Sequence, residues 1–159
     1  MGNPRLDWHE DRHARLLGDG FAISALLAMV DGDPDNCTLV VPGSHRLDAS
    51  AKESRYGISA DPQPGGNIRY RGDVRNADFV LLPLAAGQCF IFHPALLHAS
   101  SGMLGGEAPA RPRASIVFRV TTPEVLVSPA AYEGKQPNAG PVLMTGADAH
   151  GFNRYVPLA

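Results

Sequence analysis

Short apolar segments separated by turn residues are the feature that most limits what this chain can fold into. In 159 residues, 17 glycines and 14 prolines favour frequent turns over long helices. The segments that we expect to be strands are residues 21–30, 38–42, 79–84, 89–92, 96–100 and 113–120. Residues 31–36 form a strong turn signal, so we expect 38–42 to return beside 21–30. This pattern predicts an all-β, mainly antiparallel sandwich or barrel.

Residues 47–77 differ from the rest of the chain because they are polar and carry prolines and glycines in their middle. We expect a long loop or insertion there, with one short helix near 49–56, that forms a lid over a site or a surface excursion. The part after Pro123 shows little periodicity, although residues 152–156 could return as a short strand. With no internal repeat and no linker, residues 1–159 are predicted to form a single domain.

The strand expected at residues 113–120 has two different faces. Its odd positions include Arg113 and Arg119, whereas its even positions are all apolar. Because residues alternate sides along a strand, we expect the apolar even face to lie on the core. The mixed odd face should line a cavity or face solvent.

Two histidines and one carboxylate form the candidate metal site. His9 and Asp11 are two positions apart, so in an extended segment their side chains point the same way. His98 follows Asp11 by 87 positions (98 minus 11), in an expected strand. These three ligands on one face of divalent iron leave its other face open, as oxygen and a co-substrate require. We therefore predict that His9, Asp11 and His98 are catalytic iron ligands.

Other interpretations of these histidines stay open. With 6 histidines in the chain, a His-x-Asp pair can also arise by chance. His13 could replace His9 in a different register, and His45 is expected to fix a turn or face the cavity. His93 could support a ligand from behind. Glu10, between two ligands, should point away from the ion.

Arg113 is the candidate that would bind a dicarboxylate co-substrate. An arginine facing a cavity is costly unless it is paired, and a planar guanidinium suits a carboxylate. Ser100 lies two positions beyond the third ligand, on the same face of the expected strand. The alternative for Arg113 is a surface salt bridge with Glu107. Arg119 could be a second carboxylate contact or a solvated charge, and Trp8 a wall of the substrate pocket or a core aromatic.

Charge and apolar content exclude some partners. A formal net charge of −2 gives no basic field for nucleic acid and no attraction to a membrane surface. No apolar run approaches the ~18 residues of a membrane span, and residues 1–5 show no apolar signal core. We therefore expect a cytoplasmic protein with buried free thiols at Cys37 and Cys89, not a disulfide.

Several segments around these residues resemble the phytanoyl-CoA dioxygenase family of iron(II)- and 2-oxoglutarate-dependent oxygenases. They occur in family order between residue 8 and about residue 120, and the Pro-Gly-Ser-His run is the most specific. The segments are Trp8-His9-Glu10-Asp11, Val41-Pro42-Gly43-Ser44-His45-Arg46, Ala86-Gly87 leading into Phe90-Ile91-Phe92-His93, His98-Ala99-Ser100, and Pro112-Arg113-Ala114-Ser115. The spacing is most similar to that of bacterial small-metabolite hydroxylases such as ectoine hydroxylase.

The resemblance implies a double-stranded β-helix, or jelly roll, in which His9, Asp11 and His98 bind iron. It implies that Arg113 pairs with the distal carboxylate of 2-oxoglutarate, assisted by Ser100. The implied activity is hydroxylation of a small-molecule substrate by O2, with succinate and CO2 as co-products. Related halogenases lack the carboxylate ligand, so the presence of Asp11 favours hydroxylation or another two-electron oxidation. The pattern does not indicate which substrate is used.

The chain departs from the family pattern at its N-terminal end. Only eight residues precede His9, whereas family members carry helices and the first strands of the roll there. We therefore expect an incomplete jelly roll without its usual N-terminal helical segment. The chain would be a fragment or a shortened gene product, or a homo-oligomer or complementing chain would supply the missing edge. Two other functions stay open: a degenerate, non-catalytic binding module, and a cupin-like metalloenzyme that uses His13 or His45 as an additional ligand without 2-oxoglutarate.

Overall fold

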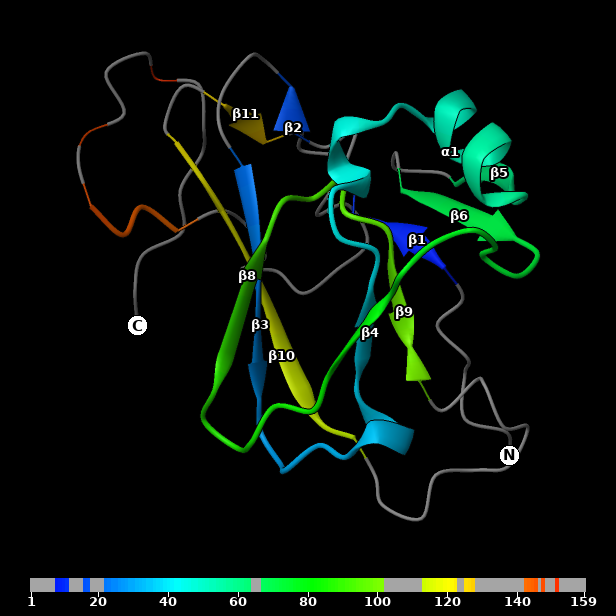
Figure 1. The fold of residues 1–159 in the computed structure, drawn as a ribbon. Coiled ribbons are helices and arrows are strands. Elements are labelled where there is room, and N and C mark those ends of the chain that lie inside the picture. The colour runs from blue at the N-terminus through cyan, green and yellow to red at the C-terminus, as the bar shows by residue number, and fades with distance from the viewer. Residues whose placement is uncertain are drawn as a thin grey trace.

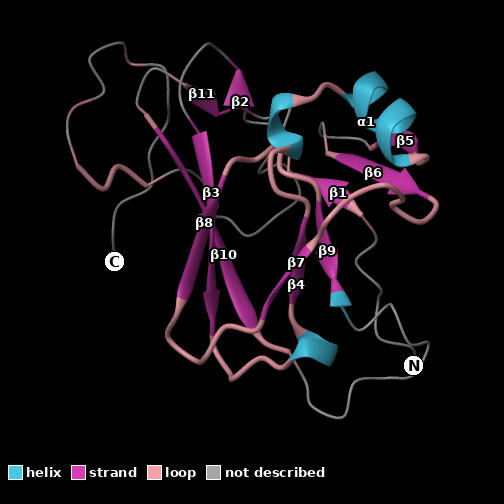
Figure 2. Cartoon of the chain, in the orientation of Figure 1, coloured by secondary structure: helices cyan, strands magenta, loops and turns pink. Residues whose placement is uncertain are grey.

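The computed structural model describes residues 8–11, 16–17, 22–63, 67–101, 113–122, 125–127, 142–145, 147 and 151. This part of the chain consists mainly of antiparallel strands, with little helix (Figures 1 and 2). The predicted all-β class is therefore confirmed. The strands are β1 (His9–Glu10), β2 (Leu16–Leu17), β3 (Ala22–Ala28), β4 (Thr38–Val40), β5 (Ser59–Pro62), β6 (Ile68–Arg71), β7 (Val80–Leu82), β8 (Cys89–Phe92), β9 (His98–Ser100), β10 (Ser115–Thr121) and β11 (Leu126–Val127).

These strands form a six-stranded sheet of order β5-β6-β1-β9-β4-β7, a three-stranded sheet of order β10-β3-β8, and a β11-β2 pair. The two larger sheets share one buried apolar cluster. Leu26 on β3 and Phe92 on β8 pack there with Val40 on β4 and with Leu96. Antiparallel sheets joined by an apolar layer form the jelly roll that the sequence predicted.

Helix α1 (Ala49–Tyr56) has the bounds that the sequence predicted. The Asp48 side chain caps its start by accepting a hydrogen bond from the Ala51 N–H at 2.7 Å. Gly57 ends it in the left-handed conformation, at φ 67°. Tyr56 anchors the helix in a second buried cluster, whose other members are Val41, Ile58, Tyr70 and Leu97.

The turn at residues 31–36 predicts that residues 38–40 pair with β3, and this prediction is wrong. β4 pairs with β9 and β7 in the larger sheet, whereas β3 pairs with β10 and β8. The short 3-10 helix Pro34–Asn36 therefore lies in a connection that crosses between sheets. All three residues of β4 are buried, and the strands on both of its edges and the packing around it account for this burial.

Residues 47–77 contain two strands that the sequence did not predict. β5 pairs with β6, and β6 pairs with β1, so this region extends the six-stranded sheet. Prolines and glycines between residues 62 and 66 obscured the strand pattern. The role of this region as a lid stays a prediction.

The apolar face of β10 lies on the outside, so our expectation that it covers the core is wrong. Ile116, Phe118 and Val120 are 43%, 46% and 51% exposed. Val117, on the mixed face, is 40% exposed, but it pairs with the buried Leu26, and Arg119 on the same face contacts Asp11. Alternation separates two faces of a strand but does not say which one is inside.

The remaining residues on the same side of the three-stranded sheet are also apolar. We call this surface the outer face; it consists of Ile23, Ala25, Leu27, Cys89, Ile91, Ile116, Phe118 and Val120. Its Cys89 is exposed, so the prediction of a buried thiol is wrong there and right for Cys37; both thiols are free. The strand predicted at 152–156 lies outside the described residues.

Candidate metal centre

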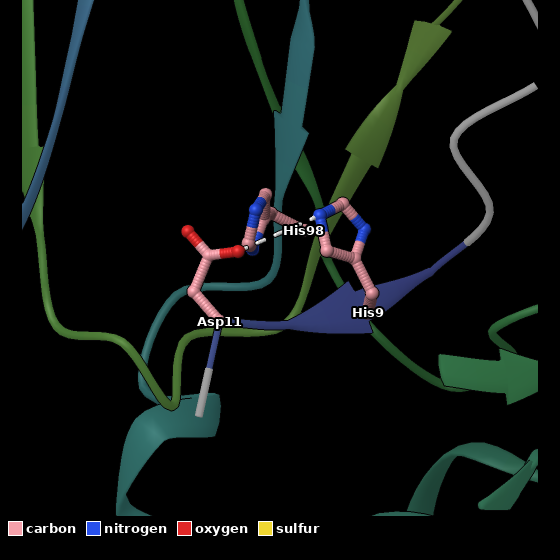
Figure 3. A group of neighbouring side chains, drawn as sticks. All are labelled: His9, Asp11 and His98. Carbon is pink, nitrogen blue, oxygen red and sulfur yellow. Dashed lines mark ion pairs between the residues drawn. The ribbon is translucent and has the colours of Figure 1, made fainter. Parts of the chain in front are cut away.

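The three predicted metal ligands meet where β1 lies beside β9. His9 is directly opposite His98 in this antiparallel pair, and their ring centroids are 4.0 Å apart. Asp11 follows β1 and turns to the same side, with its Oδ1 atom 4.0 Å from His9 Nε2 (Figure 3). One ligand atom from each residue lies within 4.8 Å of the other two. The fold therefore gathers residues that are far apart in sequence into one small cluster.

The His98 ring is held in a fixed tautomer. Its Nδ1 atom lies 2.9 Å from the Leu96 carbonyl oxygen. Because a carbonyl only accepts hydrogen bonds, Nδ1 carries the proton and Nε2 keeps a free lone pair. Burial and the neighbouring His9 lower the pKa of His98 to about 4. The ring is therefore neutral at pH 7, which is the form that binds a metal.

Both carboxylate oxygens of Asp11 have a partner from the three-stranded sheet. The fully buried Ser24 on β3 donates its hydroxyl to Oδ2 at 3.2 Å. Arg119 on β10 places Nη2 3.2 Å from Oδ1. The Asp11 N–H also donates to the Pro94 carbonyl at 2.8 Å. Ser24 was not singled out in the sequence, because nothing local distinguishes a serine inside an apolar strand.

Arg113 lies between the two larger sheets, with Ser100 beside it as the sequence suggested. Its guanidinium donates to the Ser100 hydroxyl through Nη1 and to the Thr38 hydroxyl through Nη2, the latter at 3.1 Å. Burial lowers the pKa of Arg113, and Cys37 opposes that shift. Within the described part of the chain no carboxylate forms an ion pair with it; Glu107 lies outside that part. Arg113 also lines a pocket with Leu26, Cys37, Thr38 and Leu82.

The Pro-Gly-Ser-His run supports the segment that precedes His98. Gly43 adopts φ 79°, a left-handed conformation that glycine takes with little strain. The turn directs the buried Ser44 hydroxyl to the Leu97 N–H, from which it accepts a hydrogen bond at 2.9 Å. Val41 N–H donates to the Leu97 carbonyl at 3.0 Å. The run therefore fixes the backbone immediately before His98, a candidate metal ligand.

The other candidates lie elsewhere. His45 packs against His93, with ring centroids 5.5 Å apart, and neither belongs to the ligand cluster. His13 lies outside the described residues. Glu10 is fully buried on the opposite side of β1 from the ligands, as expected. Trp8 packs against the second core cluster, so it occupies the core position that the sequence left open. A substrate contact by Trp8 stays a prediction.

The ligand atoms present fit a divalent iron ion. Two imidazoles and one carboxylate come from one side, and they are the only such group of three among the described residues. This donor set suits iron and leaves coordination positions for other molecules. No helix within the described ranges is long and apolar enough to cross a membrane.

One protein family and several solved structures are similar to this chain. A family model described as phytanoyl-CoA dioxygenase (PhyH) matches residues 1–110. A search of curated proteins found no match. Similar solved structures include the non-heme alpha ketoglutarate dependent carbocyclase SnoK from nogalamycin biosynthesis, with TM-score 0.55 and 19% identity over 82% of this chain and 48% of that one.

Two further solved structures resemble almost the whole chain. The non-heme alpha ketoglutarate dependent epimerase SnoN, also from nogalamycin biosynthesis, has TM-score 0.59 and 23% identity over 96% of this chain and 56% of its own. The non-heme monooxygenase ThoJ has TM-score 0.54 and 21% identity, over 96% of this chain and 50% of its own. The chain therefore spans about half the length of the structures it matches, and these identities indicate a shared fold.

Proposed function

The chain belongs to the phytanoyl-CoA dioxygenase family, and on that premise we propose that it is an iron(II)- and 2-oxoglutarate-dependent oxygenase that hydroxylates a small molecule. The observation that carries the proposal is the cluster of His9, Asp11 and His98, whose ligand atoms lie within 4.8 Å of one another. One SnoN structure is described as a complex with Fe3+ and alpha ketoglutarate, which supports the same pair of groups here.

The residues would divide the work as follows. His9, Asp11 and His98 would hold the iron, and Arg113 would bind the distal carboxylate of 2-oxoglutarate with help from Ser100. The Arg113 guanidinium donates hydrogen bonds to the hydroxyls of both Ser100 and Thr38, and these two contacts orient it. Iron and 2-oxoglutarate, when bound, supply oxidation of a substrate C–H bond by O2, with succinate and CO2 released. The chain's own task is to position these groups and exclude water.

Hydroxylation is the finer part of the proposal. Among the similar solved structures one is named a carbocyclase, one an epimerase and one a monooxygenase, so this fold accommodates several outcomes. Asp11 occupies the carboxylate position, which favours hydroxylation over halogenation. A product assay by mass spectrometry would distinguish a gain of one oxygen atom from loss of two hydrogens or from no mass change.

The proposal is tested by adding iron(II) and 2-oxoglutarate under anaerobic conditions. We expect a weak visible charge-transfer band, followed by succinate formation when O2 is admitted. The band should be lost in His98→Ala and kept in His45→Ala, because His45 lies outside the ligand cluster. Well-folded protein that shows no band would reject the metal site.

The same assay distinguishes two alternative functions from the proposed one. A non-catalytic binding module would form the band, or bind ligand, without producing succinate. A cupin-like enzyme would turn over equally well in Arg113→Ala, because it does not use 2-oxoglutarate. The hydroxyl-supported Arg113 and its lack of a carboxylate partner among the described residues favour the oxygenase over both.

The exposed apolar residues of the outer face support the expectation that another polypeptide chain binds there. Ile91 is 61% exposed and Val120 is 51% exposed, and this surface is apolar throughout. Exposure of so large an apolar sheet face to water is unfavourable. We expect a second copy or a complementing chain to cover it, in a cytoplasmic enzyme.

A further inference from the structure

We propose that the buried cluster of Glu10, Lys52 and Tyr70, here called the back cluster, positions the metal ligands from the opposite side of the six-stranded sheet. The inference rests on the proposed metal site and assigns it supporting residues. None of the three would touch iron, substrate or 2-oxoglutarate. They are positioning residues.

All three residues of the back cluster are buried. Glu10 and Lys52 have 0% of their surface exposed, and Tyr70 has 2%. Lys52 Nζ lies 2.5 Å from Glu10 Oε1 and 2.9 Å from the Ala95 carbonyl oxygen. The Tyr70 hydroxyl donates to the same Glu10 oxygen. An ammonium on α1, a carboxylate on β1 and a hydroxyl on β6 are therefore joined at one point.

This point lies directly behind two of the metal ligands. Glu10 stands between His9 and Asp11, and consecutive strand residues point to opposite faces. Fixing the Glu10 carboxylate therefore fixes the rotation of β1 about its own axis. That rotation decides whether the His9 and Asp11 side chains converge.

Lys52 also reaches the segment that carries the third ligand. Ala95 lies three positions before His98, and the neighbouring Pro94 carbonyl accepts the Asp11 N–H at 2.8 Å. The Lys52 ammonium is therefore bonded both to β1, through Glu10, and to the segment just before β9, through the Ala95 carbonyl. It sets the spacing between the two segments that must meet at the metal.

The cost of this arrangement argues for a positional role. Removing an ammonium and a carboxylate from water is unfavourable, and apolar residues of similar size often stabilise a core as well or better. The surrounding cluster is already apolar, with Ile58 and Leu97 among its members. Directional hydrogen bonds to Glu10 and to a specific carbonyl provide a precision that apolar packing does not.

The test compares cobalt(II) binding by the full chain and its variants, followed through the visible bands of the bound ion. The main variant, Glu10→Gln with Lys52→Met, removes both buried charges together. It therefore leaves neither charge unpaired, and the net charge of the chain does not change. We expect it to fold but to bind cobalt(II) about 10- to 100-fold more weakly, the usual effect of losing outer support for ligands. Its cobalt spectrum should also shift, because the ligand geometry relaxes.

A second variant and a control complete the experiment. Tyr70→Phe removes only one hydroxyl, and we expect it to weaken cobalt(II) binding several-fold; it decides the question if the double variant does not fold. Asp61→Asn with Arg71→Gln removes an exposed ion pair from the same sheet and should change nothing. Variants of the back cluster that bind cobalt(II) with unchanged affinity and spectrum would overturn the inference. A wild-type chain that binds no metal would instead reject the proposed function.

Discussion

Arg119 on β10 places its guanidinium 3.2 Å from the Asp11 carboxylate, which is one of the three candidate metal ligands. The contact joins the three-stranded sheet to the metal centre on the six-stranded sheet. The oxygen that it occupies, Oδ1, is also the one nearer His9. A cation that binds Asp11 through Oδ1 therefore shares this oxygen with Arg119 or displaces the arginine.

We expect Arg119→Gln to strengthen metal binding. The variant removes a positive charge and a competitor for Asp11 Oδ1. Because the Arg119 side chain is 39% exposed, the gain should be that of a partly screened ion pair, roughly 0.2–1 kcal/mol, or about a 1.4- to 5-fold tighter Kd. A cobalt(II) titration measures it, with Arg71→Gln as the matched control. Weaker binding in Arg119→Gln would mean that the arginine orients Asp11 and does not compete for it.

The metal-free protein should lose stability as the pH falls from about 6.5 to about 4. His98 has a folded-state pKa of about 4 against 6.5 unfolded, so in this window only the unfolded chain takes up the proton. That uptake favours unfolding, by at most about 3 kcal/mol at the acid end. Urea unfolding at several pH values measures the slope.

The matched comparison for this prediction is His98→Asn, which has no titrating ring. Its free energy of unfolding should fall less steeply over the same pH range, since only the other groups contribute. Equal slopes in the two proteins would show that His98 titrates normally in the folded state.

Arg113→Lys should weaken 2-oxoglutarate binding without weakening metal binding. Lysine keeps the positive charge but not the two parallel donors, and the Ser100 and Thr38 hydroxyls are placed to orient a guanidinium. Loss of one charged hydrogen bond, about 1.5–3 kcal/mol, corresponds to roughly a 10- to 100-fold higher Kd. Titration of the anaerobic iron(II) protein with 2-oxoglutarate tests it, and Arg71→Lys serves as control. An unchanged Kd would place the co-substrate elsewhere.

Ser44→Ala should destabilise the fold. Its hydroxyl is fully buried and accepts the Leu97 N–H at 2.9 Å, so alanine leaves a buried donor unsatisfied. The expected loss is about 1–3 kcal/mol of unfolding free energy. Chemical denaturation measures it beside Ser59→Ala, a surface change that should stay within about 0.5 kcal/mol. Similar values for the two variants would contradict the role given to Ser44.

Phe118→Thr should reduce self-association while leaving stability nearly unchanged. Phe118 is 46% exposed in the middle of the outer face, so little packing within the chain is lost. Threonine keeps strand propensity and lowers the apolar area. Static light scattering over a range of concentrations measures association, with Val142→Thr as a control outside this face. An unchanged mass would show that the outer face is not where copies meet.

Local pattern was sufficient for much of the fold. The short helix expected near 49–56 is present with those bounds, and the structure shows that Asp48 and Gly57 cap its two ends. The strands at 89–92 and near 113–120 likewise followed from apolar residues bounded by turns. β5 and β6 did not, because their few apolar residues lie among arginines and prolines and pairing with β1 stabilises them.

For the metal centre, the sequence supplied the donor types and the two-residue spacing of His9 and Asp11, because alternation along a strand is a local property. Tertiary structure decided that β1 lies beside β9, which brings His98 opposite His9. It also decided that Lys52 and Ser24, which are inconspicuous in the sequence, lie against Glu10 and Asp11. Which strands pair, and which face of each strand is buried, depends on the total apolar surface that the whole sheets bury. A short stretch of sequence does not determine that total.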